Sequence, residues 1–127
     1  MTRAISITDS IAIGGDNPPV FICGPCVIES RDHALSMASL MRELKDECRI
    51  NLVFKSSFDK ANRSSIRSFR GPGLEEGLRI LEEVRREFGL PVLSDIHDAS
   101  QAAAAISTSD PVAIKMASGV AAESRST

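Results

Sequence analysis

The sequence predicts an α/β fold built on a parallel sheet, and three features carry this prediction. Four short apolar runs, each three to five residues long, recur along the chain at 20–23, 50–54, 91–93 and 111–114. They do not alternate with polar residues, which is typical of strands buried on both faces of a parallel sheet. The longer segments between them place apolar residues at helical spacing. Strand, helix and strand in repetition give parallel strands joined by right-handed crossovers.

A small hairpin is predicted ahead of these units. Ile5 and Ile7 precede the polar triplet 8–10, and Ile11 and Ile13 follow it, so that apolar residues recur at period two on both sides of a turn. A Gly-Gly-Asp-Asn-Pro-Pro segment at 14–19 then interrupts any regular structure. We therefore treat residues 1–19 as a separate N-terminal unit.

Three helices are expected between the strands. Ser30 is the N-cap of the first, whose apolar stripe consists of Ala34, Met37, Ala38, Met41 and Leu44. Gly89 is placed to end the second, whose stripe consists of Leu74, Leu78, Leu81, Val84 and Phe88. Asp98 and Gln101 resemble a capping box for a third helix through 102–106.

The number of units limits the architecture. Residues 20–116 hold three to four βα units, and the segment 117–127 is a small, polar, irregular tail. A closed (β/α)8 barrel takes about 250 residues. The chain is therefore expected to form either a small open sheet or half of a barrel.

Composition excludes several classes of protein. The net charge of −2, the pI of about 5.7 and the absence of Trp and Tyr argue against a nucleic-acid binder. No stretch approaches the ~20 apolar residues of a membrane span, and the first residues lack a signal-peptide core. Three cysteines are an odd number, which favours a reduced setting over a disulfide scaffold. We expect a cytoplasmic protein.

The densest chemical signal is a cationic segment that begins where the second apolar run ends. Residues 55–70 include one acidic residue, Asp59, and five basic residues, which are Lys55, Lys60, Arg63, Arg67 and Arg70. Sites of α/β enzymes lie at the carboxyl ends of strands. Cations, Ser and Asn donors and nearby glycines suit a phosphate or a carboxylate. The alternative is a solvated basic loop.

The Cys-Gly-Pro-Cys sequence at 23–26 has two functional interpretations. A thioredoxin-like redox pair of Cys23 and Cys26 would need a helix to begin directly behind the second thiol, and residues 27–29 intervene before Ser30. Alternatively, Cys26 lies at a strand end where its thiolate would bind a metal, although one cysteine does not make a site. For Cys23 and Cys48 we favour small buried hydrophobic side chains.

Asp95, Ile96 and His97 close the third predicted strand, again at a carboxyl end. A carboxylate there is suited to orient sugar hydroxyls, and His97 to move protons or pair with a phosphate. The alternative for Asp95 is helix entry. His33, in the first turn of a helix, is interpreted as structural.

Four stretches together resemble 3-deoxy-D-manno-octulosonate 8-phosphate synthase. They run in order over roughly residues 20–105, and the Lys-Ala-Asn-Arg-Ser-Ser element at 60–65 is highly specific. The stretches are Gly-Pro-Cys-Val-Ile-Glu-Ser at 24–30, Phe-Lys-Ser-Ser-Phe-Asp-Lys-Ala-Asn-Arg-Ser-Ser at 54–65, Phe-Arg-Gly-Pro-Gly-Leu-Glu-Glu-Gly-Leu at 69–78 and Asp-Ile-His at 95–97.

The resemblance implies a fold and an activity. The family forms (β/α)8 TIM barrels, usually tetrameric, so that residues 1–127 would be the N-terminal part of one barrel domain whose bottom is plugged by the 1–19 hairpin. The enzyme condenses phosphoenolpyruvate with D-arabinose 5-phosphate and releases phosphate, which supplies the eight-carbon acid sugar of Gram-negative lipopolysaccharide. This chain would be less than half of an active enzyme, so we expect it to be inactive alone. A non-catalytic anion-binding fragment is the remaining alternative.

The resemblance also implies roles for individual residues. Lys55 and Lys60 would hold phosphoenolpyruvate, and Asn62, Arg63 and Ser64 would reach the pentose phosphate, partly across a subunit interface. The full substrate-binding set is Lys55, Ser57, Lys60, Asn62, Arg63, Ser64 and Asp95, and the catalytic set is Lys60, Asp95 and His97.

Two further features refine the assignment within this group. Cys26 marks the branch that depends on a divalent metal ion, whose other ligands (a His, a Glu and an Asp) lie further along such enzymes. The sister enzyme of aromatic biosynthesis carries Pro-Arg-Thr where this chain carries Ala-Asn-Arg-Ser at 61–64. That difference favours the pentose phosphate over the tetrose phosphate as the second substrate.

Overall fold

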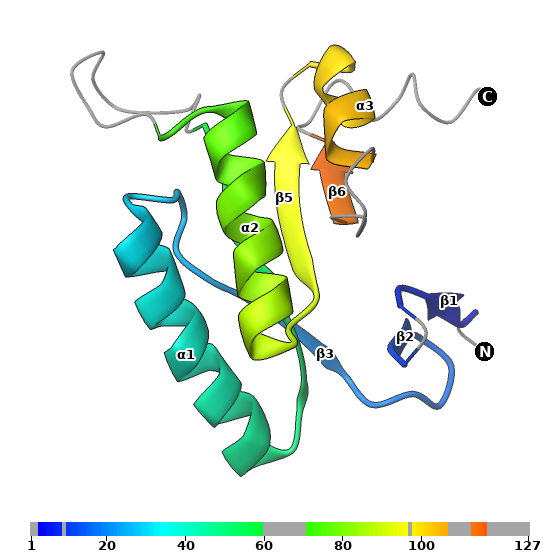
Figure 1. Ribbon diagram of the computed structural model, residues 1–127. Coiled ribbons are helices and arrows are strands. Elements are labelled where there is room, and N and C mark those ends of the chain that lie inside the picture. The colour runs from blue at the N-terminus through cyan, green and yellow to red at the C-terminus, as the bar shows by residue number, and fades with distance from the viewer. Residues whose placement is uncertain (1–2, 9, 60–70, 97, 107–112, 117–127) are drawn as a thin grey trace.

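A four-stranded parallel sheet organises the chain. The computed structural model describes residues 3–8, 10–59, 71–96, 98–106 and 113–116. Within these ranges the strand order is β3-β4-β5-β6, with neighbouring strands parallel (Figure 1). The strands are β3 (Val20–Cys23), β4 (Asn51–Lys55), β5 (Val92–Ile96) and β6 (Ala113–Met116). The predicted α/β class with a parallel sheet is confirmed.

The two long helices form where the capping signals predict them. Helix α1 (Arg31–Cys48) begins after Ser30, whose Oγ accepts the backbone N–H of His33 at 3.0 Å. Helix α2 (Leu74–Phe88) ends at Gly89, which adopts the left-handed conformation with φ of 66° and donates its N–H to the carbonyl of Arg85 at 2.9 Å. A glycine reaches this conformation without the strain that a Cβ would impose.

The third helix begins two residues before the predicted segment. Helix α3 spans Ser100–Ile106, and the Asp98 carboxylate accepts the backbone N–H of Ser100 at 2.9 Å. This hydrogen bond from the Ser100 backbone holds the pKa of Asp98 below its ordinary value. Asp98 therefore caps the helix as expected, but through Ser100, whereas the sequence pattern pointed to Gln101.

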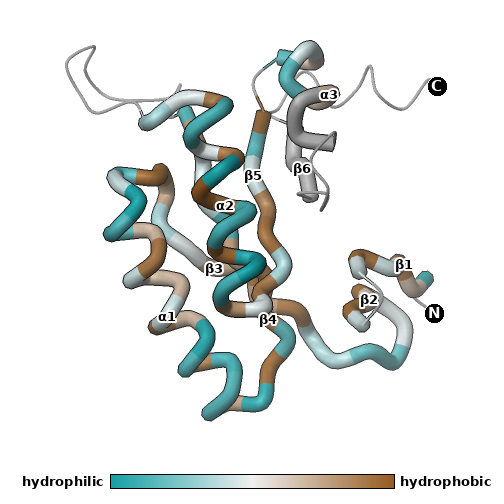
Figure 2. The backbone as a smooth tube through the Cα atoms, viewed as in Figure 1, coloured by the Kyte–Doolittle hydropathy of each residue, from teal (hydrophilic) through white to brown (hydrophobic). Residues whose placement is uncertain are grey.

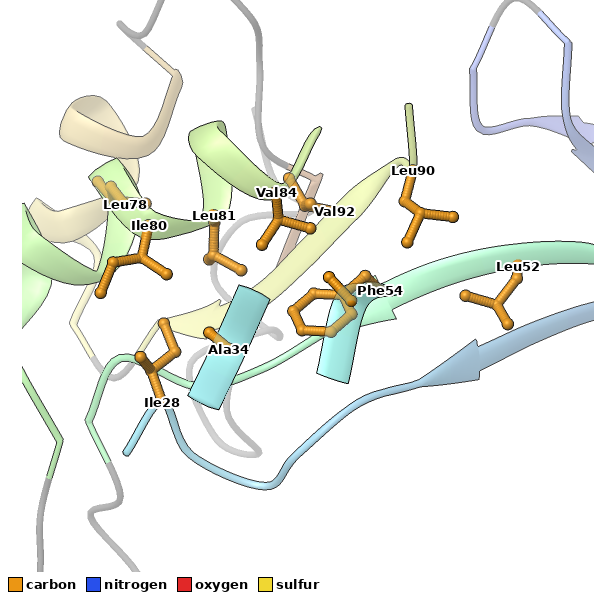
Figure 3. Packing of buried hydrophobic residues seen from close by; sticks show 11 residues of the cluster. Ile28, Ala34, Leu52, Phe54, Leu78, Ile80, Leu81, Val84, Leu90 and Val92 are labelled. Atoms are coloured by element: carbon orange, nitrogen blue, oxygen red, sulfur yellow. The ribbon is translucent and has the colours of Figure 1, made fainter. Parts of the chain in front are cut away.

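The hydrophobic core lies between one face of the sheet and the paired helices α1 and α2. Figure 2 shows hydrophobic and hydrophilic residues alternating along α2, and most of the buried residues of this helix belong to the core cluster. Phe54 of β4 lies at the centre, with Leu81 and Val84 of α2 and Ala34 of α1 around it (Figure 3). Each is fully buried, so the side chains that precede the predicted site are held firmly.

Two predictions of burial are wrong at the outer side of α1 and β3. Leu44, assigned to the buried stripe of the first helix, is 43% exposed. In β3, Phe21 and Ile22 are 45% and 53% exposed, although an apolar run without alternation predicts burial on both faces. The reason is topological, because β3 is the edge strand of the described sheet and has a neighbouring strand on one side only.

The N-terminal hairpin is confirmed. Strands β1 (Ile5–Ser6) and β2 (Ala12–Ile13) pair antiparallel, with Ile5 opposite Ile13. Thr8 stabilises the turn, because its hydroxyl accepts the backbone N–H of Ile11 at 3.1 Å. That this hairpin plugs the bottom of a barrel stays a prediction.

The later strands extend beyond their apolar runs. Strand β5 continues three residues past the run 91–93 and includes Asp95 and Ile96, which were expected to close it. Strand β6 lies slightly later than the predicted run 111–114. The predicted tail, 117–127, lies outside the described residues. Within the described part of the chain, no helix is both long and apolar enough to cross a membrane.

An ion pair joins the outer surfaces of the two long helices. The guanidinium of Arg31, in the first turn of α1, donates Nε–H to Glu83 of α2 at 2.9 Å, and a second nitrogen contacts the other carboxylate oxygen. The hydrogen bond from Arg31 holds the pKa of Glu83 below its ordinary value. A two-point contact of this kind fixes the geometry of both side chains.

Replacing Glu83 by Gln is expected to destabilise the chain at neutral pH but not in acid. A carboxyl whose folded-state pKa is depressed contributes stability above its unfolded-state pKa, and this is lost as pH falls through the folded-state value. Urea midpoints of the wild type and Glu83→Gln should therefore differ at pH 7 and converge well below the ordinary Glu pKa of 4.5. Glu43→Gln, at an exposed position of α1, is the control. A difference that persists at low pH would contradict the assignment.

Candidate functional site

Two charged side chains lie on the face of the sheet that α1 and α2 do not cover. Lys55 is the last residue of β4, and Asp95 is the next-to-last residue of β5. Side chains alternate along a strand, so Lys55 lies opposite to the buried Phe54, and Asp95 opposite to Val92. The carboxyl ends of neighbouring parallel strands meet at one edge, which brings the two residues together.

The two charges are linked through a serine hydroxyl. Lys55 Nζ donates to Ser57 Oγ at 3.2 Å, and that hydroxyl donates to the Asp95 carboxylate. Lys55 Nζ lies 3.9 Å from Asp95 Oδ1. The side chains of Lys55 and Asp95 are 26% and 21% exposed, so both are held in place and still accessible to a solute. The ammonium can bind an anion, and the carboxylate beside it can accept hydrogen bonds from hydroxyl groups at an adjacent point.

The segment after β3 is attached directly to the segment after β4. Ser57 donates its N–H to the carbonyl of Cys26 at 3.2 Å, and its own carbonyl accepts the N–H of Ile28 at 2.9 Å. Ser56 Oγ donates to the carbonyl of Pro25 at 2.8 Å. A Cβ on Gly24 would overlap the carbonyl oxygen of Lys55, so only glycine permits this approach. The segment that carries Cys26 thus has a defined position relative to Lys55.

The described residues on the two sides of 60–70 lie together. Phe58, which is buried in the first part of the predicted cationic segment, accepts the N–H of Gly73 at its carbonyl oxygen at 3.1 Å. Gly71, with φ of 118°, approaches so closely that a Cβ would overlap the same carbonyl oxygen. Gly77 of α2 packs against the Phe58 side chain in the same way. The chain therefore leaves the edge of the sheet after Phe58 and returns to it at Gly71.

Several predicted site residues lie outside the described residues. They are Lys60, Asn62, Arg63, Ser64 and His97, together with Arg67 and Arg70 of the cationic segment. Their roles stay predictions. Of the predicted residues that the structure describes, Lys55, Ser57 and Asp95 are brought into contact, and Cys26 lies on the adjoining segment.

The cysteines give the redox interpretation no support. Cys23, predicted to be buried, packs against the hydrophobic core but is only partly buried, whereas Cys26 is exposed beyond the end of the strand, and both thiols are free. Cys48, predicted to be buried, is exposed at the last position of α1. This prediction is wrong because Cys48 continues the helix face of Leu44, which is itself 43% exposed near the end of α1.

The backbone of His33 has a structural role at the start of α1, because its N–H donates to the hydroxyl of the N-cap residue Ser30. This agrees with the structural interpretation from the sequence. Nδ1 of His33 lies 3.7 Å from Oε2 of Glu29. Among the residues that the structure describes, no three His, Cys, Asp or Glu side chains gather where they would hold a metal ion.

Sequence reasoning missed Gly24 and Ser56 as residues that shape the site. Gly24 belongs to the Gly-Pro-Cys element, where attention went to the cysteine. Ser56 stands between Lys55 and Ser57, and nothing in the local pattern separates one serine from the next. The available signal was a small polar residue directly after a strand with a buried apolar centre, where a buried hydroxyl must find a partner.

Comparison with known proteins identifies the family. The sequence profile of the DAHP synthetase I family matches residues 3–118. Three curated relatives carry the name 2-dehydro-3-deoxyphosphooctonate aldolase. The protein from Syntrophotalea carbinolica is 49% identical over 110 residues, 87% of this chain and 39% of the relative. Those from Geobacter sulfurreducens and a Synechococcus species are 52% identical over 101 residues and 57% over 97.

These matches cover most of this chain and a minor part of each relative. The alignments with the Geobacter and Synechococcus proteins take in 80% and 76% of the chain but 37% and 34% of the relatives. The chain thus spans well under half the length of the curated relatives it matches. The resemblance to the octulosonate phosphate synthases, first inferred from four motifs, is confirmed. A match that runs over almost the whole sequence places this chain in the DAHP synthetase I family of enzymes.

Proposed function

We propose that this chain contributes part of the active site of an enzyme that condenses phosphoenolpyruvate with D-arabinose 5-phosphate. The products are 3-deoxy-D-manno-octulosonate 8-phosphate and phosphate. The observation that carries the proposal is the linked set Lys55, Ser57 and Asp95 at the carboxyl ends of β4 and β5. It presents a cation and a hydrogen-bond acceptor side by side, in a family whose relatives are named for an octulosonate phosphate.

The chemistry requires these two kinds of group. Both substrates are anions, so their reacting carbons approach only if the repulsion between them is neutralised. Carbon 3 of the enol forms a bond with the aldehyde carbon, water adds at carbon 2, and the bond from carbon 2 to the phosphate oxygen then breaks to release phosphate. The Lys55 ammonium would bind the phosphoenolpyruvate anion and stabilise the charge that develops. Asp95 would accept hydrogen bonds from the pentose hydroxyls.

The residues of the cationic segment complete the proposal. Lys60 would hold phosphoenolpyruvate with Lys55, and Asn62, Arg63 and Ser64 would bind the pentose phosphate. His97, which follows β5 directly, would transfer a proton. The contact of Phe58 with Gly71 and Gly73 supports this proposal, since it joins the described residues on the two sides of 60–70, and Phe58 follows Lys55 by three residues.

The metal and the assembly belong to the proposal as well. Cys26 carries an exposed, free thiol, which suits a ligand of a divalent metal ion, but one thiol does not form a site. Among the described residues no set of partner ligands gathers, and the resemblance implies that a His, a Glu and an Asp further along such enzymes would supply the other ligands. The roles proposed for Lys55 and Asp95 do not involve the metal ion. The complete enzyme would be a (β/α)8 barrel that assembles as a homotetramer.

The test is release of phosphate from phosphoenolpyruvate. It is measured with and without arabinose 5-phosphate, on this chain alone and on a full-length chimera, in which the chain replaces the matching segment of the Syntrophotalea relative. We expect the chain alone to be inactive and the chimera to release phosphate only when the pentose phosphate is present. EDTA should abolish this release and a divalent metal ion restore it. A folded chimera that releases no phosphate would overturn the proposal in favour of an anion-binding role.

A further inference from the structure

Ser56 occupies a position at which three segments of the site meet. Its side chain is fully buried, its hydroxyl donates to the carbonyl of Pro25 at 2.8 Å, and its backbone N–H donates to the carbonyl of Leu93 at 3.2 Å. Pro25 lies between β3 and Cys26, and Leu93 lies in β5 two residues before Asp95. One residue therefore connects the segments that carry Cys26, Lys55 and Asp95.

We propose that Ser56 is a positioning residue, which holds the segment 24–28 against the Lys55–Asp95 pair. The assignment rests on the proposed function, since it names how that site keeps its geometry. Within the described part of the chain, the hydrogen bonds of Ser56 go to the carbonyls of Pro25 and Leu93 and to no charged group. Its two chain neighbours do contact charged groups of the site, because Lys55 and Ser57 form the linked set with Asp95. A shift of the Ser56 backbone would therefore move the ammonium and the hydroxyl together.

The surroundings explain why a hydroxyl is needed at this position. The Pro25 carbonyl accepts its hydrogen bond from a fully buried side chain, and removal of that donor would leave the carbonyl without this partner, which is costly. Gly24 brings the backbone of the same segment so close to Lys55 that no Cβ fits there, so the two segments are in tight contact beside Ser56. The other bonds between the two segments, from Ser57 to Cys26 and from Ile28 to Ser57, join backbone groups. They fix the distance between the segments, and the Ser56 hydroxyl adds the contact that fixes Pro25.

Ser94 offers a matched control. It is a serine of the adjacent strand β5 and is also buried, but its hydroxyl donates to the carbonyl of the next residue, Asp95, at 3.2 Å. That bond connects no two segments. Ser56→Ala and Ser94→Ala therefore remove the same group at similar burial, and only the first releases the contact to Pro25.

The first measurement is amide hydrogen exchange of the chain, followed by NMR. In the wild type, the amides of Ser57 and Ile28 should exchange slowly, because they form the backbone bonds between the two segments. Ser56→Ala should accelerate both by about tenfold or more, the change that losing one hydrogen bond produces. The amide of Leu81, in the middle of α2, should change little. Ser94→Ala should leave the Ser57 and Ile28 amides at their wild-type rates.

A second pair of variants separates the hydroxyl from the volume of the side chain. Thr and Val have the same shape, and only Thr retains the donor, so Ser56→Thr should restore slow exchange where Ser56→Val does not. This pair also serves if Ser56→Ala does not fold. Equal acceleration of Leu81 and Ser57 in Ser56→Ala would show a purely global destabilisation and overturn the proposal. Fast exchange of Ser57 and Ile28 in the wild type would overturn it as well.

Kinetics of the chimera connect Ser56 to the reaction. We expect Ser56→Ala to lower kcat by about tenfold or more, since small displacements of reacting groups are costly, with a smaller change in KM. Ser56→Thr should recover most of kcat. An unchanged kcat in a folded Ser56→Ala chimera would overturn the positioning role. A wild-type chimera without phosphate release would instead refute the proposed function, and the exchange experiment distinguishes this case because it requires no activity.

Discussion

Replacing Lys55 by Ala is expected to reduce kcat/KM of the chimera by about 10²- to 10³-fold, equivalent to roughly 3–4 kcal/mol of transition-state stabilisation. The size follows from the position of the ammonium. Lys55 is three-quarters covered, and its Nζ lies 3.9 Å from Asp95 Oδ1. A partly desolvated cation at the point where an anionic substrate reacts contributes far more than one in bulk water.

The structure also predicts what the substitution leaves intact. Asp95 keeps its hydrogen bond from Ser57 when Lys55 is truncated, so the carboxylate stays in position but loses the neighbouring positive charge. We therefore expect binding of phosphoenolpyruvate to weaken more than binding of the pentose phosphate. Lys55→Arg keeps the charge and should recover part of the activity only, because a planar guanidinium cannot reproduce the single contact with Ser57 Oγ.

Steady-state kinetics of the chimera, with each substrate varied in turn, measure these effects. Lys45→Ala is the control, since Lys45 lies in the last turn of α1, on the opposite side of the core from the site. It removes the same charge from the protein and should leave kcat/KM unchanged. Near wild-type turnover in Lys55→Ala would show that Lys55 does not contact the substrate, and would remove the observation on which the proposed function rests.

The elements that the sequence predicted best are those whose signals are local. Ser30 and Gly89 mark the start of α1 and the end of α2 because capping depends on residues within one turn. The hairpin of β1 and β2 was predictable for the same reason, because its two strands and their turn lie within ten residues of each other. The position of Lys55 and Asp95 at one edge of the sheet was also predictable, because the carboxyl ends of parallel strands must meet.

The exposure of side chains in the outermost strand, β3, was not predictable from the sequence. The run 20–23 looks the same whether its strand is central or at an edge, and only the strand order decides how exposed Phe21 and Ile22 are. Contacts between segments distant in sequence had no local signal either. The hydroxyl of Ser56 reaches Pro25, 31 residues earlier, and Ser57 reaches Asp95, 38 residues later. Motif resemblance identified Ser57 and Asp95 as site residues, but only the folded arrangement showed that they contact each other.

Phe54 connects the core to the site, and its replacement by Ala is expected to cost about 3–5 kcal/mol of unfolding free energy. Phe54 is fully buried among Leu81, Val84 and Ala34, and nothing in such a packed interface can move to fill the space of the ring (Figure 3). Single domains have total stabilities of about 5–15 kcal/mol, so the loss is a large fraction of what holds the chain folded.

Phe21→Ala provides the matched comparison. Phe21 is also a phenylalanine of the parallel sheet, one strand away in β3, but it is 45% exposed and its truncation should cost less than about 1 kcal/mol. Urea unfolding of the two variants, followed by circular dichroism, measures both values. A wide separation would show that the layer between β4 and the helices α1 and α2 is the packed core, which supports the strand that ends at Lys55. Similar losses in the two variants would show that strand β3 is as tightly packed as strand β4. The difference in burial between Phe21 and Phe54 would then be wrong, and so would the position of Lys55 that is argued from it.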